Sequence, residues 1–131
     1  MTHTAHISHD AILRAQVALF HVHPTVREQV AAYRVLAQVS PLAYLPLLAH
    51  ALSMYVMHDF ADRPDTALAL RAEAVDAARR MNSLEAGREP LLINTLKSYR
   101  MQLERMGRQE ELSAVEEEIA LLEAGQPRSG A

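Results

Sequence analysis

The sequence predicts an all-α fold in which six helices pair into three antiparallel hairpins. Apolar residues recur at spacings of three and four over six stretches of helical length, and no stretch of convincing length shows the alternation of a strand. Each stretch is bounded by a proline, a glycine or a capping residue. Of the 131 residues 50% are hydrophobic but only 5% are aromatic, so the core draws mainly on Leu, Ala, Val and Met, which suit helices.

The first hairpin is predicted on the two sides of His23-Pro24. Its first helix covers about residues 10–22, because the residue before a proline is pushed out of the helical region. Its second helix covers about residues 25–39, where Thr25 is a candidate N-cap and Glu28 completes a capping box. The short link between them predicts antiparallel neighbours.

The second hairpin begins at Ser40-Pro41, which supplies an N-cap and a first-turn proline. Its first helix covers about residues 42–60, and Pro46 lies early enough in it to be tolerated. Its second helix covers about residues 65–81 and starts with acidic side chains, which favour the positive end of a helix dipole. Residues 82–89 are then predicted to form a loop.

The third hairpin is predicted from a helix at about residues 90–106 and another at about residues 109–124. Gly107 separates them as a helix-stopping glycine. The domain organisation that follows is a flexible, histidine-containing N-terminus at residues 1–9, one helical domain at residues 10–124, and a flexible tail at residues 125–131.

Composition excludes several classes of function. The formal net charge is -3 and Lys97 is the only lysine, so the basic stripe of a nucleic-acid-binding protein is missing. No cysteine is present for a disulfide or a thiolate metal site. The N-terminus lacks the pattern of a signal peptide, and no apolar run approaches the roughly 20 residues of a membrane span. We expect a cytoplasmic protein with no nucleic-acid or membrane partner.

An internal repeat is indicated by the second helices of the three hairpins. Val30, Ala67 and Leu112 occupy matching places in them, at spacings of about 37 and then 45 residues, which is typical of a helical array. A helical bundle without repeats is the alternative.

The repeat resembles the tetratricopeptide family in its longer-period bacterial form, over residues 10–124. Gly107-Arg108-Gln-Glu-Glu111 looks like the turn and second-helix start of that repeat, and Tyr44-Leu-Pro46-Leu-Leu-Ala49 is similar to the start of its first helices. The resemblance implies a right-handed superhelix whose first helices line a concave groove for a peptide or a partner helix. Three pairs are close to the minimum for a stable array, so exposed apolar ends predict a homodimer.

Candidate chemistry is sparse. His3, His6 and His9 are spaced by three, and His21 and His23 form a second pair, a residue type that suits zinc, copper or nickel. Because the N-terminal segment is predicted to be flexible and no metalloprotease motif is present, we expect no metal site, and a metal-responsive role stays as an alternative.

No catalytic site or cofactor is expected. His58 and Asp59 are adjacent, but neighbours along a helix point in different directions and do not form a catalytic pair. The four glycines are isolated, so no phosphate loop exists.

The groove implied by the resemblance gives the candidate binding residues. They lie at helical spacing away from the core face: Leu52, Val56 and Asp59 in the third helix, and Asn94, Lys97, Met101 and Arg105 in the fifth. Asn94, Lys97 and Arg105 could hold a peptide carboxylate or backbone, as Asn, Lys and Arg do in some tetratricopeptide domains. The spacing here does not reproduce that clamp, and ordinary surface charges are the alternative for Lys97 and Arg105.

The function predicted from the sequence is a non-enzymatic scaffold or adaptor that binds a protein or peptide partner. The alternative is a self-assembling helical homodimer with a structural or regulatory role.

Overall fold

The computed structural model describes residues 8–20 and 23–126, and within these ranges it contains six helices and no strand. The predicted all-α fold is therefore confirmed. The helices are α1 (His9–Leu19), α2 (Val26–Val39), α3 (Pro41–Asp59), α4 (Pro64–Leu84), α5 (Glu89–Met106) and α6 (Gln109–Ala124). None of the described helices combines the length and the apolarity needed to cross a membrane.

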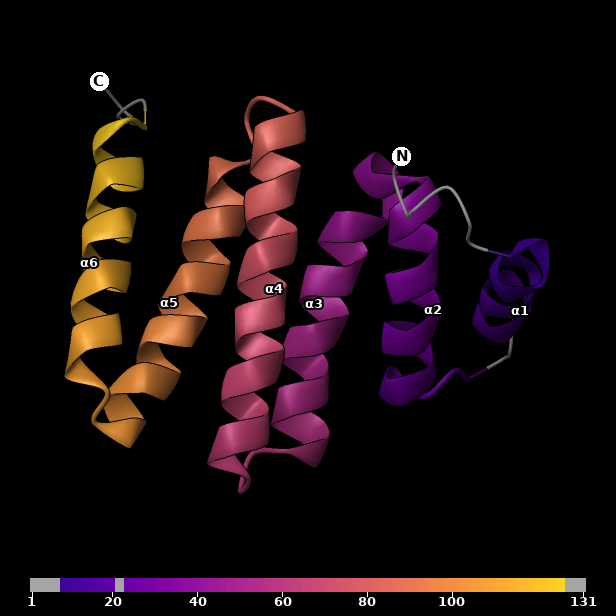
Figure 1. The fold of residues 1–131 in the computed structure, drawn as a ribbon, viewed down its shortest axis with the longest axis horizontal. Coiled ribbons are helices and arrows are strands. Elements are labelled where there is room, and N and C mark those ends of the chain that lie inside the picture. Colours follow the sequence, from indigo (N-terminus) through magenta and orange to yellow (C-terminus); the bar gives the residue numbers. More distant parts are fainter. Residues whose placement is uncertain (1–7, 21–22, 127–131) are drawn as a thin grey trace.

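The helices form a row of stacked hairpins, in which each packs mainly against its neighbours along the chain (Figure 1). Ion pairs also join α2 to α4 and α4 to α6, whereas α3 and α5 share two surface hollows. The second helices of the hairpins therefore neighbour one another on one side of the array, and α3 and α5 do so on the other. The handedness of a superhelix stays a prediction.

Local capping explains several of the helix ends. The predicted capping box at α2 is present, because the Glu28 backbone N–H donates to the Thr25 hydroxyl at 3.1 Å and the Thr25 N–H donates to the Glu28 carboxylate at 2.9 Å. Gly107 ends α5 in the left-handed region with φ of 68°, where a glycine carries no steric cost. Ser40 separates α2 from α3 without a side-chain capping bond.

Two helix ends differ from the prediction. The first helix ends at Leu19, where Phe20 is the C-cap with an 84% exposed side chain, whereas residues 21 and 22 of the predicted helix lie outside the described residues. The fourth helix continues to Leu84, past the predicted end at Met81. Met81 is fully buried, and the chain contains no helix breaker before Gly87, so the helix persists for three more residues.

The core consists of three clusters that follow one another along the row. The first joins α1 to α2, the second joins α2, α3 and α4, and the third joins α4, α5 and α6. The fully buried side chains Leu36, Leu52 and Leu96 stand one in each cluster. Packing is thus mainly between neighbours, as in repeat proteins.

Two bidentate Arg–Glu ion pairs of the same geometry define the spacing between the repeat units. Arg34 donates to both carboxylate oxygens of Glu73 at 2.7 and 2.8 Å, and Arg79 does the same to Glu118 at 2.6 and 3.0 Å. Both pairs span 39 residues, and Arg79 follows Arg34 by 45 residues. We call these pairs the Arg–Glu clamps.

The predicted spacing of 37 residues between the first two second helices is therefore corrected to 45. Val30 corresponds to the buried Val75 and not to Ala67. The two registers differ by 8 residues, which is roughly two helical turns, so both keep the apolar residues on the same face. The hydrophobic pattern is therefore compatible with both spacings.

The clamps are expected to couple second helices measurably. In a double-mutant cycle with Arg34→Ala and Glu73→Ala, the coupling in the free energy of unfolding should be about 0.5–1 kcal/mol, the upper range for an exposed pair, because the contact is bidentate. Urea unfolding measures it, and 1 M salt should reduce it. The single contact between Lys97 and Glu123, at 3.2 Å, is the matched control and should give a smaller coupling. Equal coupling in the two cycles would contradict the bidentate assignment.

Candidate binding groove between α3 and α5

A groove made of two hollows lies between α3 and α5, and both hollows share Ser53 and Ser98. The small hollow has a volume of about 200 Å³ and the large hollow about 450 Å³. The small hollow is lined by Ala49, His50, Ser53, Leu91, Asn94, Thr95 and Ser98. The large hollow is lined by Ser53, Val56, Met57, Ala61, Arg71, Ser98, Met101, Gln102 and Arg105.

Two hydroxyl groups that line the groove form hydrogen bonds with carbonyl groups of their own helices. Ser53 Oγ donates to the Ala49 carbonyl at 3.2 Å. The buried Thr95 Oγ1 lies 3.1 Å from the Leu91 carbonyl and 2.9 Å from the Leu92 carbonyl, a common arrangement of serine and threonine within helices. The exposed side chains of His50 and Asn94, and the half-buried Ser98 hydroxyl, are therefore the polar groups that the small hollow offers to a ligand.

Two arginines give the large hollow its charge. Arg71 comes from α4 and Arg105 from α5, and neither forms an ion pair with any carboxylate of the described residues. Arg105 Nη2 instead lies 3.7 Å from Met101 Sδ. Burial first, and the charge of Arg105 second, lower the pKa of the partly buried Arg71 guanidinium. The large hollow thus holds two cations that the described chain does not neutralise.

Gln102 adds an unpaired amide to the same hollow. Its side chain is only 6% exposed, and it forms no hydrogen bond with any described residue. The fully buried side-chain polar atom without a partner among the described residues is Asn82 Oδ1, so the unpaired Gln102 amide keeps some access to solvent through the hollow. An unpaired amide in such a narrow space still loses part of its hydrogen bonding to water. The large hollow therefore combines uncompensated charge with an unused donor and acceptor.

Four of the residues predicted from the sequence line the groove. Met101 and Arg105 line the large hollow with exposed side chains, and Asn94 lines the small one. Val56 also borders the large hollow, but it is 2% exposed and packs in the core, so it offers a ligand almost no surface. The groove thus brings together residues that α3 and α5 contribute separately.

The other three predicted residues lie elsewhere. Leu52 requires a correction, because its side chain is fully buried in the core and cannot contact a ligand. Lys97 is exposed and forms an ion pair with Glu123 of α6 at 3.2 Å. Asp59 is exposed at the end of α3 and lines neither hollow.

Sequence reasoning missed Arg71 and Gln102. Arg71 stands on a second helix, and only the two-layer arrangement shows that it reaches a hollow between first helices. Gln102 follows Thr95 by seven residues and so lies on the same helix face. The burial of both residues is visible only in the structure, and no sequence pattern marks Gln102 as buried.

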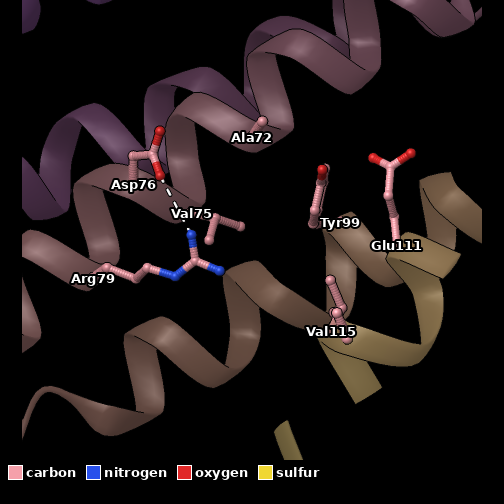
Figure 2. A pocket seen from close by; sticks show the side chains of 8 residues that line it. Ala72, Val75, Asp76, Arg79, Tyr99, Glu111 and Val115 are labelled. Carbon is pink, nitrogen blue, oxygen red and sulfur yellow. Dashed lines mark hydrogen bonds and ion pairs between the residues drawn. The ribbon is translucent and has the colours of Figure 1, made fainter. Parts of the chain in front are cut away.

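A third hollow, of about 310 Å³, lies between α4, α5 and α6 (Figure 2). Its charges are already paired: Arg79 lies 3.4 Å from Asp76 and belongs to a clamp, and Glu111 lies 2.6 Å from Arg108. Burial first, and the charge of Glu111 second, raise the pKa of Tyr99 beside them. The charged groups of this hollow therefore already have partners within the chain, and we interpret the hollow as part of the packing between α4 and α6.

Neither metal ligands nor similarity to known proteins assign a function to the groove. Among the described residues no group of three or more His, Cys, Asp or Glu side chains could hold a metal ion, and His3, His6 and His21 lie outside these residues. The chain matches no family model, no curated protein and no solved structure.

Replacing the unpaired amide should stabilise the protein. Methionine has a similar volume to glutamine and needs no hydrogen bond, so Gln102→Met should raise the free energy of unfolding by about 0.5–1 kcal/mol. Urea unfolding followed by circular dichroism measures the change.

The matched control is Thr95→Val, which removes a buried hydroxyl that already has carbonyl partners. It should leave stability unchanged or lower it by up to about 1 kcal/mol. A loss of stability in Gln102→Met as large as that of the control would show that the amide has a partner.

Proposed function

We propose that this protein is a non-enzymatic interaction module that holds a segment of a partner protein in the groove between α3 and α5. The observation that carries the proposal is that the two hollows adjoin at Ser53 and Ser98, which line both, so that together they follow α3 and α5. A continuous groove on two rigid helices suits an extended or helical segment.

The lining of the groove supports the same function. Met57 and Met101 are 62% and 54% exposed, and both line the large hollow. Methionine is flexible and polarizable, so it adapts to varied apolar side chains and is over-represented on surfaces that bind peptides. Asn94 and His50 offer hydrogen bonds at the other end of the groove.

The resemblance to tetratricopeptide repeats also supports the proposal. It implies that first helices line the binding groove, and α3 and α5 are the first helices of the second and third hairpins. A dissociation constant of micromolar order, about -8 kcal/mol, would be ordinary for such a groove.

Groove binding can be tested without knowing the partner. Twelve-residue peptides selected from a random display library on the full chain should lose at least tenfold in affinity for a Met57→Lys, Met101→Lys variant, because charge then replaces the apolar lining. The matched control is Leu84→Lys, an exposed residue outside the groove. Fluorescence anisotropy measures affinity, and circular dichroism checks that helicity is unchanged. Peptides that bind all three proteins equally would contradict the proposal.

Self-assembly through α1 is a second candidate function. Leu13 and Val17 of α1 and Phe20 at its C-cap are exposed and spaced by four and three residues, so they form one apolar stripe. An unburied stripe of this kind favours association of two copies of the chain.

Sedimentation tests this second function. At concentrations of about 100 μM the chain should form dimers, since weak protein contacts are populated in this range. A Val17→Ser, Phe20→Ser variant should be monomeric, whereas Leu121→Ser, which removes an exposed leucine from α6, should not change the mass. A monomer for the unmodified chain would rule out this candidate.

A further inference from the structure

We propose that the large hollow is a carboxylate site that anchors an aspartate or glutamate side chain of the bound segment. This inference rests on the proposed function of the groove. It names the chemistry of the anchoring residue, which neither the hydrophobic pattern nor the exposed methionines specify.

The charge balance of the chain is the first reason. Three arginines of α2, α4 and α5 meet carboxylates: Arg34 and Arg79 form the clamps, and Arg100 lies 3.8 Å from Glu104. Arg27 and Arg80 have no carboxylate partner among the described residues, but both are exposed to solvent and line neither hollow. Arg71 and Arg105 face one hollow with no such partner among the described residues. Two guanidinium groups facing one space attract an anion and can hold its oxygens with paired N–H donors.

Arg71 and Arg105 have no charged counterparts in the preceding unit of the repeat. In the register of the clamps, the position 45 residues before Arg71 is Val26. In α3 and α5 the buried Leu48 and Leu52 correspond to Leu92 and Leu96 at a spacing of 44 residues. The position 44 residues before Arg105 is Ala61, which follows the end of α3 and lines the large hollow itself. The positions that correspond to the two arginines therefore carry no charge.

The buried amide of Gln102 is the second, independent reason. It lines the same hollow, is more than nine-tenths buried, and has no hydrogen-bond partner among the described residues. Its NH₂ group can donate to a carboxylate oxygen, which would satisfy a group that the folded chain leaves unpaired.

The depth and lining of the hollow favour an acidic side chain as the occupant. Arg71 belongs to α4, which lies in the layer behind α3 and α5, so the carboxylate must reach inward from a backbone that follows the groove. The volume of about 450 Å³ exceeds that of a carboxylate alone. The exposed Met57 and Met101 line the rest, and they suit an apolar neighbour of the acidic residue.

Phosphate fits this hollow less well. Phosphate sites in proteins commonly use backbone N–H groups at the start of a helix. None of the lining residues lies in the first turn of α3, α4 or α5, so the donors here are side chains.

The test uses the full chain with ¹³C-methyl-labelled methionine, because Met57 and Met101 line the hollow whereas the buried Met81 does not and serves as the reference. The probe is the blocked peptide acetyl-Leu-Glu-Leu-amide. It should shift both groove methyl signals saturably, with a dissociation constant of millimolar order. Its neutral counterpart, acetyl-Leu-Gln-Leu-amide, should bind at least about tenfold more weakly, which corresponds to the loss of one ion pair.

Three variants locate the site. Arg71→Gln and Arg105→Gln should each weaken binding of the glutamate peptide about tenfold or more, since each removes one guanidinium. Arg80→Gln removes an exposed arginine of α4 that lies outside the hollow, and it should leave the dissociation constant within about twofold. Circular dichroism confirms that each variant keeps its helices.

Two further ligands distinguish a side-chain carboxylate from a C-terminal carboxylate and from phosphate. Acetyl-Leu-Gln-Leu with a free C-terminal carboxylate, or inorganic phosphate, should bind more weakly than the glutamate peptide. If either binds more tightly, the assignment to an acidic side chain is overturned.

The remaining outcomes separate this inference from the groove function. Equal binding of the glutamate and glutamine peptides overturns the carboxylate site but leaves the groove as a peptide site. Absence of any methyl shift with all four ligands also overturns it, whereas the peptides selected by display decide the groove function separately.

Discussion

The array depends on α4, whose small side chains are buried on two sides. Ala74 and Ala77 pack in the cluster shared with α2 and α3, whereas Val75 and Ala78 pack in the cluster shared with α5 and α6. Alanine lets neighbouring helices approach closely on both faces, which a larger residue would prevent. The Arg–Glu clamps reinforce the same helix, because one ends on α4 and the other starts from it. The two halves of the array are therefore held together through one element.

This constraint also creates the groove. With α4 fixed behind them, α3 and α5 stand as neighbours, and the space between them is lined by Ser53 and Ser98 and not filled by large side chains. Arg71 extends into the large hollow from α4, so the helix that joins the halves also supplies a charge to the candidate site. A binding site built on packed helices keeps its geometry better than one built on loops.

The features that the sequence predicted correctly are local ones. Thr25 with Glu28 and the stop at Gly107 depend on residues within one turn, so their signals are readable without tertiary structure. The 45-residue register depends on which helices meet, and a shift of about two turns left the apolar pattern unchanged. Leu52 was misplaced for a related reason: periodicity locates a face, but packing on both sides of a helix decides which residues of that face remain open. Arg71 required the two-layer arrangement.

The balance between stability and binding explains why the large hollow differs from the rest of the chain. Arg71 is partly buried beside another cation, which opposes folding in the unbound protein, and Gln102 is 6% exposed with no hydrogen-bond partner among the described residues. Val26 and Ala61 stand at the corresponding places of the preceding unit, and neither carries a charge. A carboxylate in the hollow would neutralise the cations and give the amide an acceptor, which converts the same groups into binding energy.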